Sequence, residues 1–452
     1  MAQKPEKTTT EPMAKPEKKK KNRKKTALKI IAVILAVIIG VGGIGTIITL
    51  VSSGANIKLA KSYAKVAYDS QLIPEKDDDG DWTFTTDRDF KIVQLTDIHI
   101  GGGNLSAKND SNAITTVASM LTAEKPDLVI VTGDIAFPVP FKAGTFNNKT
   151  GAKTFASLME SLGVYWTLAF GNHDTEAYSY YSREDIADFY MNGDYPHCIF
   201  VPGPDDVDGS GNQVIKIKNS KGIITQALYV FDSHSYIDGD FLGIQWKYDN
   251  IHENQIDWYS SRVAQLNDEN ASAVSEARSS DPSGNYLPLT NVKSLAFFHI
   301  PLTEFKDAWT EFEDNGYKDT DEVHYKGGLL GETGERAIYS GIHEDNLFET
   351  MLSLGSTKGV FCGHDHFNNF TINYKGIDLV YGYSVDYLAY GGINKKGSQR
   401  GCTVITTKPD GTYTIEKNNL YKSGKYDIPA GFADNISMQF EDVTFRYFEE
   451  KK

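Results

Sequence analysis

The stretch that decides the fold is Phe90-Lys91-Ile92-Val93-Gln94-Leu95-Thr96-Asp97-Ile98-His99. It is a largely apolar, β-type run that ends in a carboxylate and an imidazole two positions apart. Such a run is typical of a buried strand, and open α/β sheets place their functional groups at strand ends. We therefore expect Asp97 and His99 to lie where a buried strand ends and to face a site.

Four more short polar phrases occur along the chain, and each follows an apolar run of the same kind. They are Gly133-Asp134 after residues 128–132, Gly171-Asn172-His173-Asp174 after 164–170, His299 after 295–298, and Gly363-His364-Asp365-His366 after 358–362. The glycines let the chain turn sharply and let the backbone approach a site closely. Together the five phrases supply seven oxygen and nitrogen donors suited to divalent cations: Asp97, His99, Asp134, Asn172, His299, His364 and His366.

Two cations held about 3.5–4 Å apart need a shared anionic ligand, and Asp134 is the natural bridge. We assign one ion to Asp97, His99, Asp134 and His366, and the other to Asp134, Asn172, His299 and His364. Mixed imidazole, carboxylate and amide ligands favour Mn, Fe or Zn over Ca, and the lack of cysteine argues against a structural zinc site. Taken singly, His299 could be a core histidine and Asn172 a turn residue, but neither alternative explains seven donors together.

In this order the phrases resemble the signature of the calcineurin-like metallophosphoesterase superfamily, over roughly residues 89–407. Further stretches, such as the run Phe297-Phe298-His299-Ile300-Pro301-Leu302, are similar to its purple-acid-phosphatase-like branch. The resemblance implies an α/β fold, a four-layer α/β/β/α sandwich, with the ligand roles given above. It also implies that the histidine of Gly-Asn-His-Asp, His173, is the general acid.

The chain departs from that branch at one position. Purple acid phosphatases carry a tyrosine three residues after the bridging aspartate, and its phenolate binds ferric iron, whereas this chain has Phe137. A phenyl ring cannot ligate a metal, so we expect a colourless enzyme without an iron–tyrosinate bond.

The expected chemistry follows from the cations. A hydroxide that bridges them is available near neutral pH and would attack phosphorus in line, without a covalent phosphoenzyme. We expect His173 to protonate the leaving oxygen and Asp174 to hold its ring in the right tautomer. His234, after residues 227–231, could donate to the substrate phosphate or could be an exposed loop histidine.

The first fifty residues predict where this chemistry takes place. Residues 1–29 form a disordered basic segment, and residues 30–51 are free of charge, which is about 33 Å of helix and enough to cross a bilayer core of about 30 Å. Because positive charge stays on the cytoplasmic side, we expect a single-pass cell-membrane protein with a cytoplasmic N-terminus and an extracellular catalytic domain. A cleavable signal peptide is the competing interpretation.

The rest of the chain divides into a stalk or linker at 52–88, the metallophosphoesterase domain at 89–419 and an extension of unknown role at 420–452. Helical patterns at 111–124, 152–162, 184–190, 252–267 and 344–354 alternate with the strands, as in α/β proteins. Short β-type runs after residue 369 would complete the second sheet. We expect residues 269–289 to be a surface loop and residues 303–341 to overhang the metals.

Charge narrows the choice of partners. The first 51 residues carry a net charge of +8, and the whole chain carries −14, so the remainder carries −22. A domain this acidic is a poor nucleic-acid binder, so no nucleic-acid partner is expected. The three scattered cysteines cannot form a disulfide framework.

Three functions remain. The leading one is a membrane-anchored, outward-facing phosphatase acting on phosphomonoesters, either small molecules or a phosphorylated envelope component. The second is a phosphodiesterase or pyrophosphatase acting on nucleotides or lipid-linked cell-envelope intermediates. The third is a non-catalytic surface-binding protein on the same scaffold.

Overall fold

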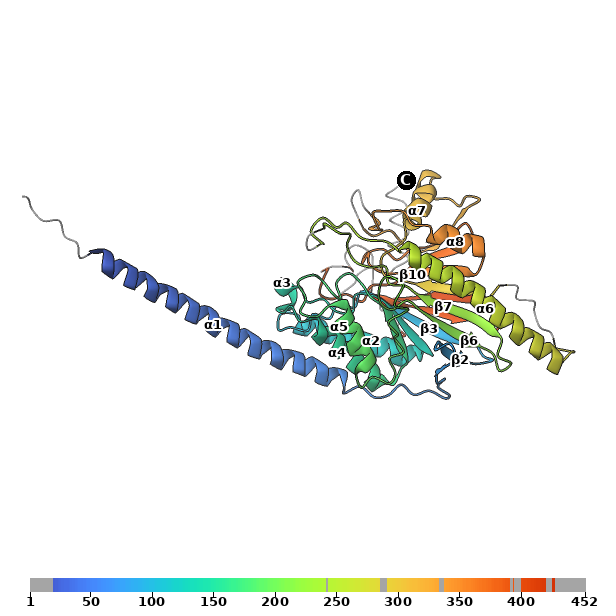
Figure 1. Ribbon diagram of the computed structural model, residues 1–452, viewed down its shortest axis with the longest axis horizontal. Coiled ribbons are helices and arrows are strands. Elements are labelled where there is room, and N and C mark those ends of the chain that lie inside the picture. Colours follow the sequence, from blue (N-terminus) through green and yellow to red (C-terminus); the bar gives the residue numbers. More distant parts are fainter. Residues whose placement is uncertain are drawn as a thin grey trace, which may run out of the picture.

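Two β-sheets lie face to face with helices outside them, in a mixed α/β sandwich (Figure 1). The computed structural model describes residues 19–240, 243–284, 291–332, 337–390, 393, 400–419 and 425–426, without the side chains of 19–26, 34–46 and 419. The sandwich confirms the α/β class predicted from the alternating runs. Of the segment 1–29, predicted to be disordered, residues 19–29 are helical and belong to α1 (Lys19–Ala60). Residues 1–18 and most of the predicted extension 420–452 lie outside the described residues.

The larger sheet has nine strands in the order β1-β2-β6-β7-β8-β10-β12-β11-β9. Its centre is parallel, with β7, β8, β10 and β12 running in one direction. The strands are β1 (Glu75–Lys76), β2 (Trp82–Thr85), β6 (Gln213–Lys218), β7 (Ile224–Val230), β8 (Ser294–Phe297), β9 (Val323–Gly327), β10 (Thr357–Cys362), β11 (Thr371–Tyr374) and β12 (Ile377–Tyr381).

The smaller sheet has five strands in the order β14-β13-β3-β4-β5. The strands are β3 (Phe90–Leu95), β4 (Leu128–Thr132), β5 (Trp166–Ala169), β13 (Gly401–Thr407) and β14 (Tyr413–Asn419). β3, β4 and β5 are parallel, and β13 is antiparallel to β3. The expectation that all late strands complete the second sheet is therefore wrong for β13 and β14, which extend the sheet that contains β3.

The apolar runs are continuous because both faces of the central strands are buried. In β3, for example, Ile92 faces the other sheet in a core with Phe297 and Phe361, whereas Val93 faces the helices. The strand sequence thus fills two cores, one between the sheets and one beneath the helices.

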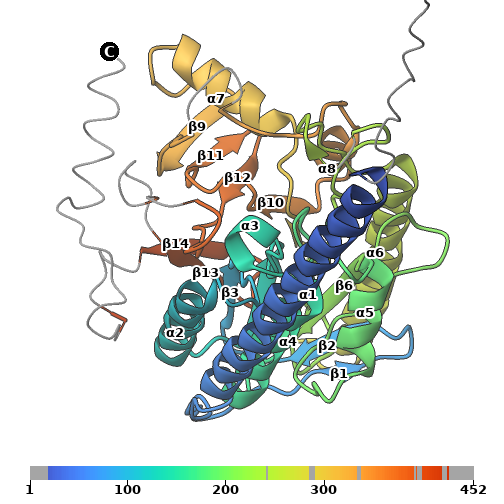
Figure 2. The ribbon, with the colours of Figure 1, turned by 90° about the vertical axis from the view of Figure 1, so that its left-hand side faces the viewer.

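Helices α2 (Ala107–Glu124), α4 (Asn148–Leu162) and α5 (Arg183–Asn192) cover the smaller sheet, together with the end of α1 (Lys19–Ala60) (Figure 2). Helices α6 (Glu253–Ser280), α7 (Glu304–Asp314) and α8 (Leu347–Leu354) cover the larger sheet, and the short α3 (Pro140–Ala143) follows β4. The predicted loop at 269–289 is wrong up to Ser280, because α6 continues there and buries Ala277. Residues 285–290 lie outside the described part.

Residues 52–88, expected to be a stalk, pack against the domain instead. The end of α1 packs on α2 and α4, and β2 pairs in parallel with β6. The acidic turn before β2 surrounds the fully buried Lys216, whose Nζ lies 3.3 Å from Asp81 and 3.0 Å from Glu269. The ammonium offsets part of the negative charge of this turn, and its ion pairs join the segment to the sheet.

The predicted membrane span falls within α1, which runs unbroken from Lys19 to Ala60. Across the described residues, no helix is both long and apolar enough to cross a membrane. The side chains of residues 34–46, in the middle of the predicted span, lie outside that description.

Candidate metal centre

The seven predicted donors converge at one end of the sandwich, where strands of both sheets end. Asp97 and His99 follow β3, Asp134 follows β4, and Asn172 follows β5 in the smaller sheet. His299 follows β8, and His364 and His366 follow β10, in the larger sheet. The smaller sheet thus contributes four of the donors and the larger sheet three.

The first group is made of Asp97, His99, Asp134 and His366, which are all buried and offer ligand atoms within 4.8 Å of one another. His99 Nε2 lies 3.3 Å from Asp134 Oδ2 and 3.8 Å from Asp97 Oδ1. His366 Nε2 lies 3.4 Å from Asp97 Oδ1. These contacts place the four side chains of the first predicted ion in one group.

The second group shares Asp134 with the first. His299 Nε2 lies 3.3 Å from Asp134 Oδ2, 3.1 Å from Asn172 Oδ1 and 3.3 Å from His364 Nδ1. One carboxylate oxygen, Asp134 Oδ2, therefore lies at the same distance from an imidazole of each group. This is the arrangement expected of a carboxylate that bridges two ions.

The donors fit cations because several of them lack other partners. Within the described residues, Asp134 Oδ2 and both ring nitrogens of His99 are buried and make no hydrogen bond. Burial lowers the pKa of His99 and of His299, but the surrounding carboxylates, Asp134 foremost, raise each pKa to about 9. The cluster attracts positive charge strongly, whether as protons or as metal ions.

The backbone is strained at the donors. Asp97, His99, Asp134 and His364 all have positive φ, between 50° and 75°, which non-glycine residues rarely adopt. The adjacent glycines are required by space: a Cβ on Gly171 would lie 2.1 Å from Asp134 Oδ1, and one on Gly363 would lie 1.8 Å from Thr96 Oγ1. Strain of this kind persists where the surrounding structure fixes a functional geometry.

Hydrogen bonds orient the imidazoles. His299 Nδ1 lies 2.8 Å from the carbonyl oxygen of Thr132, which directs Nε2 toward Asp134. His366 Nδ1 lies 3.0 Å from Asp386 Oδ2, which directs Nε2 toward Asp97. Asp386 was not predicted, because its own sequence neighbourhood carries no metal-ligand pattern. The contact is the usual way in which proteins fix the ring of a ligating histidine.

The expected partner of His173 is wrong. Asp174 accepts backbone hydrogen bonds from Asp134, Ala136 and Gly171 at 2.8–2.9 Å. His173 Nδ1 instead lies 2.6 Å from Glu176 Oε1. Burial lowers the pKa of His173, but the charges of Asp134 and Glu176 raise it overall. Glu176, three residues after His173, is thus the group that holds its ring.

Phe137 lies in the position expected for the missing tyrosine. Its ring centroid is 4.7 Å from that of His99 and 4.8 Å from that of His173, and the side chain is buried. The phenyl ring therefore packs between a predicted ligand and the predicted acid.

His234 does not lie over the donors as we expected of a phosphate-binding group. Its ring stacks on His252 at 4.0 Å, and its Nε2 lies 2.9 Å from Gln255 Oε1. Tyr236, in the same loop, does reach the cluster, because its hydroxyl accepts from Asn172 Nδ2 at 3.0 Å. This contact turns the Asn172 oxygen toward His299.

A pocket of about 300 Å³ opens onto the cluster. Two of its residues, Glu332 and Tyr339, come from the stretch 303–341 that we expected to overhang the metals. The described residues that line it are Asp134, His173, Trp246, Tyr248, Glu332, Tyr339, His364, Asp365, His366 and Tyr390. The lining therefore combines four aromatic side chains with three of the seven predicted donors, Asp134, His364 and His366.

Comparison with known families matches residues 90–382 to the family described as calcineurin-like phosphoesterase. The chain therefore belongs to the calcineurin-like phosphoesterase family, whose members are phosphoric ester hydrolases. This confirms the resemblance inferred from the five phrases.

Two plant relatives carry names that agree with the family. Probable inactive purple acid phosphatase 28 of Arabidopsis thaliana is 27% identical over 372 residues, which cover 76% of this chain and 81% of that protein. Probable inactive purple acid phosphatase 29 of the same plant is 28% identical over 340 residues, 71% of this chain and 77% of that protein. A dimetal phosphatase from Danio rerio superimposes with a TM-score of 0.44 and 11% identity, covering 73% of this chain and 96% of that one.

Replacing Asp134 by asparagine should sharply reduce bound metal while leaving the fold intact, because the change removes the shared negative charge between the two groups. Metal content is measured by mass spectrometry after gel filtration in Mn, Fe or Zn. The matched control is Asp127→Asn, which removes a buried carboxylate at the start of the same strand, where it pairs with Arg88. Equal metal content in Asp134→Asn and wild type would contradict the bridging assignment.

Proposed function

We propose that the protein is a dinuclear metal-dependent phosphatase that hydrolyses phosphomonoesters. Asp97, His99, Asp134 and His366 would hold one divalent ion, and Asp134, Asn172, His299 and His364 the other. The observation that carries the proposal is the 3.3 Å separation of Asp134 Oδ2 from both His99 Nε2 and His299 Nε2. When bound, two such metal ions lower the pKa of a coordinated water and neutralise charge on the phosphoryl oxygens.

His173 is the proposed general acid. Glu176 accepts from Nδ1 and fixes the ring, which leaves Nε2 to give its proton to the leaving oxygen. The backbone N–H of His173 donates to Asp134 Oδ1 at 2.8 Å, and this hydrogen bond fixes the position of the proposed acid relative to the bridging carboxylate. Phe137 packs on the His173 ring and limits its movement.

The pocket supports a monoester as substrate. Among the described residues that line it there is no lysine or arginine, and Glu332 adds a negative charge. A second phosphate in the leaving group would meet no cation there, whereas an uncharged or aromatic leaving group would pack on Trp246, Tyr248 and Tyr339. This argues against nucleoside diphosphates and triphosphates.

One observation favours the alternative of diesters or lipid-linked substrates. A second pocket, of about 360 Å³, shares Trp246, Tyr248 and Tyr339 with the first and adds Thr303 and Lys306. A second ester group could extend into it. The monoester assignment and this alternative predict opposite orders for the rates of monoester and diester hydrolysis.

The relatives named inactive raise the third function, a non-catalytic binding protein. An inactive protein with this fold is expected to lack some of the metal-binding residues or the general acid. Here all seven donors converge, and His173 keeps a carboxylate partner. The complete set supports catalysis.

We further propose that α1 anchors the protein in the cell membrane with the domain outside. The proposal rests on the uncharged residues 30–51 and the basic residues before them. Exposed apolar side chains near α1 support it. Thr49 of α1 bonds Asn104 at 3.0 Å, and the next residue, Leu105, is 59% exposed. Phe141 is 92% exposed and belongs to α3, which lies beside α1 in Figure 2. An apolar face next to a membrane span suits contact with lipid.

With Mn, Fe or Zn supplied, para-nitrophenyl phosphate should be hydrolysed faster than bis(para-nitrophenyl) phosphate, because the charge of a monoester dianion matches the cation pair. Release of nitrophenolate gives both rates. Faster hydrolysis of the bis ester would replace the monoesterase assignment by the diesterase one. No hydrolysis of either ester by metal-loaded protein would favour the binding protein.

His173→Ala should slow monoester turnover by about 10²–10⁴ while both ions stay bound, because the leaving oxygen loses its proton donor. Glu176→Gln should cost roughly 10–100-fold, because the ring loses its orienting charge. The matched control is Glu160→Gln, which breaks the same type of contact, 2.6 Å, at the distant His197. Loss of metal in His173→Ala would show that His173 is a ligand rather than the acid.

In intact cells, protease added outside should digest the domain, and the full chain should remain in carbonate-washed membranes. The double substitution Leu35→Lys with Ile38→Lys should release the protein, because charges at the centre of a span are costly. Recovery of uncleaved wild-type protein in the soluble fraction would refute the anchor. A product that begins near residue 55 would show a cleaved signal peptide.

A further inference from the structure

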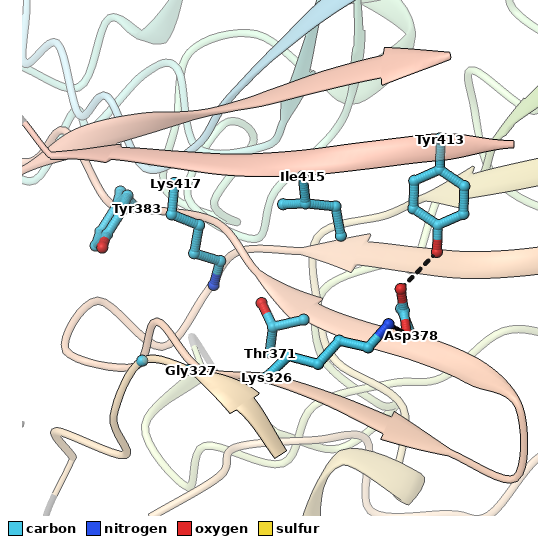
Figure 3. Close-up of a pocket in the computed structure, with 9 residues that line it drawn as sticks. Lys326, Gly327, Thr371, Asp378, Tyr383, Tyr413, Ile415 and Lys417 are labelled. Atoms are coloured by element: carbon cyan, nitrogen blue, oxygen red, sulfur yellow. Dashed lines mark hydrogen bonds and ion pairs between the residues drawn. The ribbon is translucent and has the colours of Figure 1, made fainter. Parts of the chain in front are cut away.

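A third pocket, lined by charged and polar side chains, lies at the edge of the sandwich, away from the metal centre. It has a volume of about 340 Å³ and lies between β14 of the smaller sheet and β9, β11 and β12 of the larger sheet (Figure 3). None of the seven donors lines it, and neither does His173. Its described lining residues are Lys326, Gly327, Gly328, Thr371, Asp378, Tyr383, Tyr413, Ile415 and Lys417.

Lys417 brings a charge without a counter-ion into this pocket. Its Nζ donates to the carbonyl oxygens of Asn369, Phe370 and Tyr381, the last at 2.7 Å. Within the described residues no carboxylate lies within ion-pair distance of it, and burial lowers its pKa to about 7. Three carbonyls satisfy the three N–H groups of an ammonium but leave its charge uncompensated.

Thr371 has an unused hydroxyl in the same pocket. The residue is 6% exposed, and in the described part of the chain its Oγ1 makes no hydrogen bond. Figure 3 shows the Thr371 side chain between Lys417 and Lys326. A buried hydroxyl normally finds a partner, so a ligand atom is the expected one here.

The remaining charges leave the pocket positive. Asp378 accepts from Lys326 at 2.6 Å and from the Tyr413 hydroxyl at 2.7 Å, so its charge is already engaged. Two lysines against one aspartate give the pocket an excess positive charge when Lys417 is protonated. The rings of Tyr383 and Tyr413 and the side chain of Ile415 supply an apolar wall.

We propose that this pocket is a binding site for a small oxyanion, the phosphate or carboxylate group of a small molecule. The anion would lie near the Lys417 ammonium, accept a hydrogen bond from Thr371 Oγ1 and face Lys326 at the pocket mouth. A pocket of this size also accommodates an organic body attached to the anionic group. The site is independent of the phosphatase assignment.

The test is isothermal titration of metal-stripped, chelator-free protein with inorganic phosphate and, separately, with citrate. Wild type should bind at least one of them, and the anion that binds identifies the class. Thr371→Val, which keeps the shape and removes only the hydroxyl, should weaken binding about tenfold. Lys417→Met should abolish it.

The matched control is Lys375→Met, which removes an exposed positive charge in the turn between β11 and β12 and should bind as wild type does. If Lys417→Met fails to fold, Thr371→Val decides the question. Binding by Thr371→Val with wild-type affinity, or no binding of either anion by wild type, would overturn the proposal. An unchanged phosphatase rate in Thr371→Val would confirm that the two sites are separate.

Discussion

The structure depends on the position of one carboxylate oxygen between two imidazoles. Asp134 and His99 follow strands of the smaller sheet, whereas His299 follows a strand of the larger sheet. The two halves of the cluster meet only if the sheets keep a fixed separation. The core between them sets that separation, with Phe297 and Phe361 stacked at 5.0 Å against side chains of β3 and β4. Packing between the two sheets therefore determines the geometry of the site.

Buried carboxylates that are not among the predicted metal ligands hold the strained loops in place. Asp174 accepts three backbone N–H groups around the Asp134 turn, and Asp110 accepts those of Gly101 and Gly102 after the first phrase. Asp386 does the same for residues 388–390 while it orients His366. These contacts offset the cost of positive φ at the donors, since a lost backbone bond in a buried loop is expensive.

The sequence predicted what depends on local pattern and missed what depends on three-dimensional partners. Strands 90–95, 128–132 and 377–381 have the predicted bounds, because fully buried strands read as continuous apolar runs. All seven donors converge because glycine turns and strand ends are local features. The contact of Glu176 with the His173 ring was missed, because both Glu176 and Asp174 are close to His173 in sequence. Only the conformation of the turn after His173 decides which carboxylate reaches the ring. The sheet that β13 joins was mispredicted, because the hydrophobic periodicity of a strand does not specify which sheet edge it pairs with.

The replacement of a tyrosine by Phe137 changes how the site is charged as well as how it is packed. Without a phenolate, the anionic donors of the cluster are Asp97 and Asp134 alone, since the others are an amide and imidazoles, which are neutral when they bind a metal ion. Two divalent ions would then leave two positive charges uncompensated by protein donors, and a bridging hydroxide would offset one of them. The phenyl ring, packed between His99 and His173, thus adds no charge to the cluster and holds the His173 ring beside it.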